Sequence, residues 1–206
     1  MSLKKCFSRY GILGLIVFVI LFLVFGGIVL GTQIGNDKQS YTANTISEKL
    51  ELLRTNDASI SKRDIRNELL ESSDQKELFL LSLEYYESSN TEDERIQYSG
   101  LLILINVTEF ESELYDIAIS TKSHDLFLAM IYSLMNTNTK EARQALFRLL
   151  GNADNLQNED IEYSIFETKN LLNRVLTEAD NAWISELDQS TLNEYQKEVI
   201  ESVFGN

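Results

Sequence analysis

The chain has 206 residues, with 32 Asp and Glu against 18 Lys and Arg, and a net charge of −14 at pH 7. The first 31 residues hold three of the basic residues and none of the acidic ones, so the remaining 175 residues carry 15 basic and 32 acidic side chains, a net charge of −17. Such a surface repels phosphate backbones and anionic lipid headgroups, which disfavours nucleic-acid binding by this part of the chain. The single cysteine, Cys6, excludes an internal disulfide.

Residues 11–31 consist only of Gly, Ile, Leu, Val and Phe, and Lys4, Lys5 and Arg9 precede them. At 1.5 Å per residue a helix of this length spans about 31 Å, close to the hydrocarbon thickness of a bilayer. The positive-inside rule then predicts a cytoplasmic basic tail at 1–10, a signal-anchor transmembrane helix at 11–31, a tether at 32–43 and an exported domain at 44–206. Because Val29 and Gly31 are small, cleavage by a signal peptidase is the alternative to anchoring.

Three glycines at the outer end of the predicted anchor recur every four residues: Gly27, Gly31 and Gly35. Small residues at this spacing allow two membrane helices to approach closely. They are the candidate site for self-association of the transmembrane helix, and a homodimer formed through them is an expectation that follows.

The predicted exported domain is expected to be all-α. The sequence has no proline, no Asn-Gly or Asp-Gly pair, and only four glycines after residue 31, whereas sheet proteins need many tight turns. Apolar residues recur at helical spacing from Ile46 to Val203, which predicts about ten helices. Capping signals fall at the breaks in this pattern, at Ser61, Asp74, Thr91, Thr108, Asn138 and Thr191.

The run at 101–107, LLILINV, is apolar on every face. A buried strand is the rival interpretation, but no turn residues bracket it and no second run of this kind could pair with it. It is therefore predicted to be the most buried helix of the domain.

Helix starts near 62, 92, 123 and 158 are about 30 to 35 residues apart, with a second start midway between them, a spacing typical of stacked helical hairpins. In the unit 123–151, helix 2 resembles that of a HEAT-like repeat through Asn138, Ala142, Arg143, Ala145, Leu149 and Gly151. The resemblance implies an α-solenoid, and a non-repetitive helical bundle is the alternative. Leu146 and Leu149 are expected to be buried against the helix that carries Met130 and Leu134.

No catalytic, cofactor or metal site is predicted. His124 is the only histidine and is expected to be exposed in a first helical turn, while the acidic clusters at 92–94, 109–113 and 159–160 are explained by the helix dipole. The sequence at 201–204, Glu-Ser-Val-Phe, resembles the segment around the catalytic glutamate of lytic transglycosylases, but that family needs further active-site sequence downstream, such as a Gly-Leu-Met-Gln-like stretch.

These observations predict a single-pass bacterial inner-membrane protein whose periplasmic domain is a non-enzymatic protein-binding or scaffolding module for another exported or membrane protein. The alternative is a sensory or regulatory domain that binds a ligand between helices, and a cell-wall-active enzyme comes third. A single enclosed apolar cavity lined by tyrosines or Trp183 with a few convergent polar groups would favour the sensor, and an open concave face would favour the scaffold.

Overall fold

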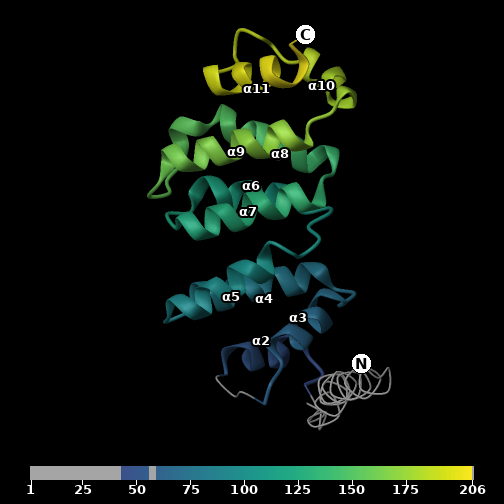
Figure 1. Ribbon diagram of the computed structural model, residues 1–206, viewed down its shortest axis with the longest axis vertical. Coiled ribbons are helices and arrows are strands. Elements are labelled where there is room, and N and C mark those ends of the chain that lie inside the picture. The colour runs from purple at the N-terminus through teal and green to yellow at the C-terminus, as the bar shows by residue number, and fades with distance from the viewer. Residues whose placement is uncertain (1–42, 56–58, 206) are drawn as a thin grey trace, which may run out of the picture. The chain divides into compact units, whose positions relative to one another are not determined.

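The structure is a computed structural model that describes residues 43–55 and 59–205 (Figure 1). These residues form ten α-helices and two short 3₁₀ helices and contain no strand, so the predicted all-α class is confirmed for this part of the chain. The helices are α2 (Ile46–Arg54), α3 (Lys62–Leu70), α4 (Gln75–Glu87), α5 (Glu92–Leu102), α6 (Glu111–Ser120), α7 (His124–Thr137), α8 (Lys140–Gly151), η1 (Ala153–Asn155), α9 (Ile161–Val175), η2 (Glu178–Asp180), α10 (Asn181–Ser185) and α11 (Glu194–Phe204).

The predicted basic tail, membrane anchor and nearly all of the tether lie outside the described residues. Among the helices of the described ranges, none combines the length and the apolar character that crossing a membrane requires. The predicted anchor at 11–31 therefore stays a prediction.

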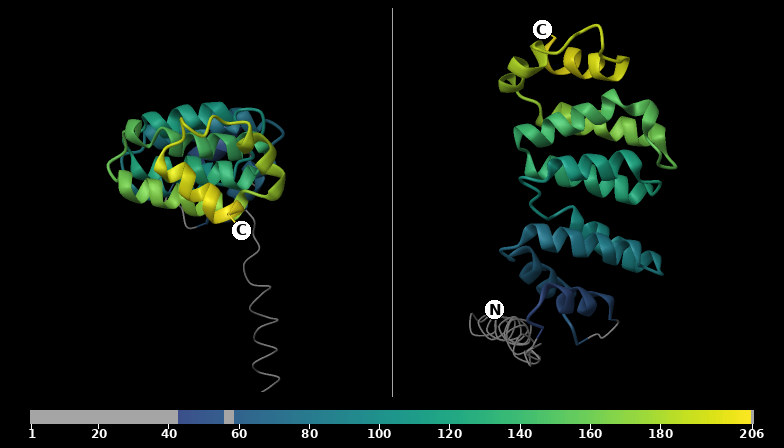
Figure 2. Two further views of the ribbon diagram at one scale, coloured as in Figure 1. Left: turned by 90° about the horizontal axis from the view of Figure 1, so that it is seen from above. Right: turned by 180° about the vertical axis from the view of Figure 1, so that it is seen from behind.

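Consecutive helices lie side by side in pairs, and the pairs follow one another in chain order (Figure 1). Helix α2 packs on α3, α4 on α5, α6 on α7 and α8 on α9, and the last layer contains α10 and α11. Neighbouring layers contact each other through α2 and α4, α5 and α7, α6 and α8, and α7 and α9, while α11 packs on both α8 and α9. The view from behind shows the same order of layers (Figure 2).

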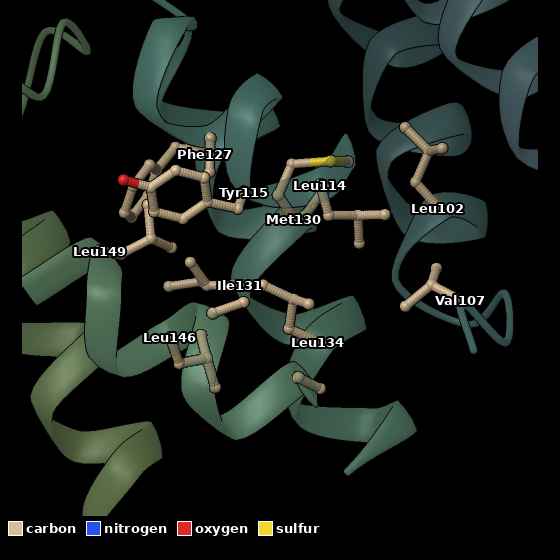
Figure 3. Close-up of a cluster of buried hydrophobic side chains, with 14 of the residues drawn as sticks. Leu102, Val107, Leu114, Tyr115, Phe127, Met130, Ile131, Leu134, Leu146 and Leu149 are labelled. Carbon is tan, nitrogen blue, oxygen red and sulfur yellow. The ribbon is translucent and has the colours of Figure 1, made fainter. Parts of the chain in front are cut away.

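The buried apolar side chains of these layers form one cluster that extends from Leu50 in α2 to Val199 in α11. Figure 3 shows its central part, to which α6, α7, α8 and the end of α5 all contribute. Leu146 and Leu149 of α8 are 0% and 1% exposed, and Met130 and Leu134 of α7 are fully buried, as the helical spacing predicts. A stack of this kind gains most of its stability from the removal of these side chains from water.

The pairing of α7 and α8 differs from the predicted hairpin at 123–151. The two helices form where expected and contact each other, but α7 pairs with α6 in one layer and α8 pairs with α9 in the next (Figure 1). Asn138, which has a left-handed backbone (φ 51°), ends α7 and turns the chain toward the next layer. The predicted unit therefore combines the second helix of one pair with the first helix of the following pair.

The run at 101–107 is not a single helix, and that prediction is wrong. Helix α5 ends at Leu102, and the chain turns so that Leu104 is 51% exposed while Ile105 and Val107 are buried. Beyond the end of α5, backbone groups of this segment form hydrogen bonds with side chains near the end of α7. Asn136 Nδ2 donates to the Ile103 carbonyl (2.9 Å), and the Val107 N–H donates to Thr137 Oγ1 (3.2 Å).

Three of the six predicted N-cap residues are correct. The side chains of Ser61, Asp74 and Thr91 each accept a hydrogen bond from a backbone N–H in the first turn of their helix, as expected. At the other three starts the N-cap lies one or two residues later than predicted, at Phe110, Thr139 and Asn193. Asn193 forms a complete capping box with Gln196, which also contributes to the site described below.

Candidate functional site

The residues singled out in the sequence do not come together as one site. Gly27, Gly31 and Gly35 lie outside the described residues, so self-association through them stays a prediction. His124 begins α7 and is half-buried rather than exposed, because its ring meets Tyr163 edge-on at 5.3 Å and its Nδ1 lies 3.4 Å from Ser164 Oγ. Glu201 is exposed on α11.

The acidic clusters serve mainly as helix starts. Glu92, Asp93 and Glu94 occupy the first turn of α5, and Asp160 caps α9. Within the described ranges, no three His, Cys, Asp or Glu side chains gather closely enough to hold a metal ion. Glu111 and Glu113 lie in the first turn of α6, and acidic side chains at such positions complement the dipole at a helix N-terminus.

A groove of about 580 Å³ lies between α8, the start of α6 and the segment from α10 to α11. It is half-open to solvent. Its apolar lining residues are Ala145, Phe147, Trp183, Leu187 and Leu192, and its polar ones are Glu111, Ser112, Glu141, Gln144, Arg148, Asn152, Thr191 and Gln196, with Gly151 beside them. Volumes of about 300 to 1,000 Å³ are usual for ligand sites, and such sites combine an apolar lining with a few convergent polar groups.

Trp183 is held at the groove by a buried carboxylate. Asp180, 1% exposed, accepts hydrogen bonds from Trp183 Nε1 (3.0 Å), from the backbone and hydroxyl of Thr177 (both 3.0 Å), and from Arg143 Nε of α8 (3.0 Å). Arg143 also donates to the Asn138 carbonyl (2.7 Å). The network joins the start of α8 to α10, and it fixes the indole against Phe147, whose ring it meets edge-on at 5.5 Å.

The charge of Asp180 is stabilised by these donors. Burial alone would raise the pKa of its carboxyl, but the hydrogen bonds from Trp183, Thr177 and Arg143 outweigh burial and lower the pKa below its ordinary value. Asp180 and Arg143 therefore form a charged pair at neutral pH, with side chains only 2% and 15% exposed.

The far wall of the groove is attached to α8 through backbone carbonyls at the end of that helix. Gln196 Nε2 donates to the Phe147 carbonyl (3.1 Å) and Asn193 Nδ2 donates to the Leu150 carbonyl (2.6 Å). A Cβ at Gly151 would lie 2.7 Å from Gln196 Nε2, so glycine lets the Gln196 side chain lie against α8. The bond from Asn193 satisfies the Leu150 carbonyl, one of the four that the end of α8 leaves without an intrahelical partner.

Arg148 lies at the same end of α8 and is exposed. Its guanidinium stacks over the Tyr115 ring at 4.3 Å from the ring centre, and the Tyr115 hydroxyl accepts a hydrogen bond from Asn152 (3.0 Å). The cation–π contact orients the guanidinium while leaving its N–H groups able to bond a ligand.

Little in the sequence indicates this groove. Phe147, Trp183 and Leu192 come from three separate segments, and their apolar character predicts only that they are buried. The Arg143 and Asp180 pair joins residues 37 positions apart, with no local pattern to connect them. Only the isolated tryptophan was a signal, as a candidate for lining a cavity.

Comparisons with protein-family profiles, with curated proteins and with solved structures found no match for this chain. The described residues thus form an all-α domain of stacked helix pairs that carries a half-open groove of ligand-binding size, and the HEAT-like resemblance at 123–151 stays a prediction.

Proposed function

We propose that this protein is a membrane-anchored, non-enzymatic binding module whose helical domain, an α-solenoid of HEAT-like character, holds a segment of another exported or membrane protein. The observation that carries the proposal is the half-open groove at Trp183. It has a preformed apolar floor, and the exposed charged side chains of Glu141 and Arg148 line it along one side of α8. An extended protein segment can enter such a groove from the side, whereas an enclosed cavity admits only a small molecule.

The construction of the groove supports the proposal, because the walls are fixed before a ligand arrives. Asp180 holds Trp183, and Gln196 and Asn193 hold α11 against α8. A preorganised site loses less conformational entropy on binding than a flexible one. Stacked helix pairs also present extended side surfaces that suit protein partners.

A sensory or regulatory ligand-binding domain is the second candidate. The volume of about 580 Å³ and the indole of Trp183 favour it, since both suit a small amphipathic molecule. The crosslinking experiment below separates the two functions, because only a protein-binding groove gives a protein adduct.

The proposed location rests on residues 11–31 and the basic residues before them. A reporter that is active only outside the cytoplasm is expected to be active when fused after Asn206 and inactive when fused after Arg9. The opposite pattern would contradict the orientation. Release of the helical domain into the soluble exported fraction would show that the anchor is cleaved.

A photo-crosslinking amino acid at Gln144 tests protein binding directly. Gln144 lines the groove and is half-exposed, so its replacement is expected to give a crosslinked adduct with one protein in intact cells. Lys197, exposed on α11 and not a lining residue, is the matched control and is expected to give no such adduct. Adducts of the same mass and yield from both positions, or none from Gln144, would contradict the proposal.

A further inference from the structure

The groove has opposite charges at its two ends. Glu141 and Arg148 both line it, both are exposed, and neither forms an ion pair with another described residue. They are seven residues apart on α8, which is two turns of the same helix face and about 10 Å along its axis. The groove thus has a carboxylate at the start of α8 and a guanidinium near its end.

A second carboxylate strengthens the acidic end. Glu111 lines the groove and accepts a hydrogen bond from Thr139 Oγ1 (2.8 Å), and Thr139 is the N-cap of α8. At the other end Arg148 is the single basic residue among the lining residues, and the Tyr115 ring orients it. The acidic end therefore has one carboxylate from α6 and one from α8, and the basic end has one guanidinium stacked on an aromatic ring.

The part between the charges is apolar on one side and offers a free amide on the other. Phe147 and Trp183 form the floor, and they are only 2% and 8% exposed. Gln144 lies on the same face of α8 as Glu141 and Arg148, and its side chain has no hydrogen-bonding partner among the described residues. A free side-chain amide can bond both the N–H and the C=O of an extended peptide.

We propose that the groove binds a protein segment in which an apolar side chain lies between one acidic and one basic side chain. The acidic group pairs with Arg148, the basic group pairs with Glu141, and the apolar side chain covers Trp183. An extended chain advances about 3.3 Å per residue and alternate side chains share one face, so the acidic, apolar and basic side chains occupy alternate positions and the two charges lie about 13 Å apart. The long side chains of the two ion pairs accommodate the difference from the axial distance of about 10 Å between Glu141 and Arg148. This inference rests on the proposed protein-binding function and specifies the chemistry of the partner.

The test is a selection of random heptapeptides displayed on phage against the full-length chain in detergent. The wild type is expected to enrich peptides with one acidic and one basic residue four positions apart and an apolar residue midway between them. Arg148→Gln is expected to lose the acidic preference only, and Glu141→Gln the basic preference only. Lys140→Gln, exposed on α8 outside the groove, is the control and should keep both.

A synthetic peptide of the enriched sequence then gives the affinity. Trp183 is the only tryptophan of the chain, so its fluorescence reports binding at the groove itself. Each charge-removing variant is expected to weaken binding roughly two- to fivefold, the range for one exposed ion pair. Enriched peptides of a single charge sign, or preferences that the two variants leave intact, would overturn the inference but leave protein binding standing. No enrichment with any form of the chain would contradict both.

Discussion

Replacing Asp180 with alanine is expected to lower the free energy of unfolding by about 3 to 5 kcal/mol, the range for removal of one partner from a buried ion pair. Asp180 is 1% exposed and accepts hydrogen bonds from Trp183, Thr177 and Arg143. Without its carboxylate, the indole N–H loses its acceptor and the Arg143 guanidinium, only 15% exposed, loses its counter-charge. Urea unfolding followed by far-UV circular dichroism measures the loss.

Asp154→Ala is the matched control, because Asp154 is exposed in η1 and its carboxylate forms no hydrogen bond or ion pair with another described residue. It is expected to change the unfolding free energy by less than about 0.5 kcal/mol. If Asp180→Ala and Asp154→Ala lower the free energy of unfolding equally, the hydrogen bonds of Asp180 do not stabilise the layer that contains α10 and α11.

The pH dependence of the unfolding free energy shows how much the charge of Asp180, as distinct from its packing, stabilises the protein. Because the folded pKa of Asp180 is lowered, its contribution is fully present above the unfolded value of 3.8 and is lost as pH falls through the folded value. Asp180→Asn removes the titrating group, so the stability of this variant should fall less than that of the wild type below about pH 4. The same unfolding measurement, repeated from pH 7 to pH 2, records the difference.

The sequence predicts which residues are buried better than it predicts which helices are neighbours. Apolar residues three and four apart place Leu146 and Leu149 on the buried face of α8 correctly. The same pattern cannot tell whether α6, α7 or α9 covers that face, because each of these helices carries apolar residues at helical spacing. In the structure α7 pairs with α6, although α7 and α8 are joined by the shorter connection.

The segment at 101–107 shows a second limit. Its composition satisfies the requirements of a buried helix, and Leu101, Leu102, Ile105 and Val107 are indeed buried. What ends the helix at Leu102 is a set of polar side chains about 30 residues later, since Asn136 and Thr137 bond the backbone of Ile103 and Val107. Tertiary hydrogen bonds override local preference here, and a pattern within one segment cannot reveal them.

The groove lies beyond sequence reasoning for the same reason. Single features such as Trp183, or Glu141 in the first turn of α8, suit many positions in a helical protein. They form a site because α11 folds back onto α8, and this contact depends on Gln196, Asn193 and the missing side chain of Gly151. The capping prediction at Thr191 missed Asn193 by two residues, and with it the residue that joins the two helices.

The centre of the stack offers the most direct test of the layer arrangement. Leu146 is fully buried, and it belongs to the cluster in which α8 packs against Ile131 and Leu134 of α7 (Figure 3). Leu146→Ala is expected to cost about 2 to 5 kcal/mol, through the lost transfer free energy and the cavity that stays when the neighbouring helices relax only in part. For a domain with a typical stability of about 5 to 15 kcal/mol, this is a large share.

Lys140→Ala is the control on the same helix. Lys140 is exposed in the first turn of α8, makes no ion pair with another described residue, and is expected to change the unfolding free energy by less than about 0.5 kcal/mol. Urea unfolding of both variants gives the contrast. If Leu146→Ala proves as mild as Lys140→Ala, α8 does not present this face to α7. The stacking of the layer of α8 and α9 on the layer of α6 and α7 would then be wrong. The groove between the start of α6 and α8 would be wrong with it.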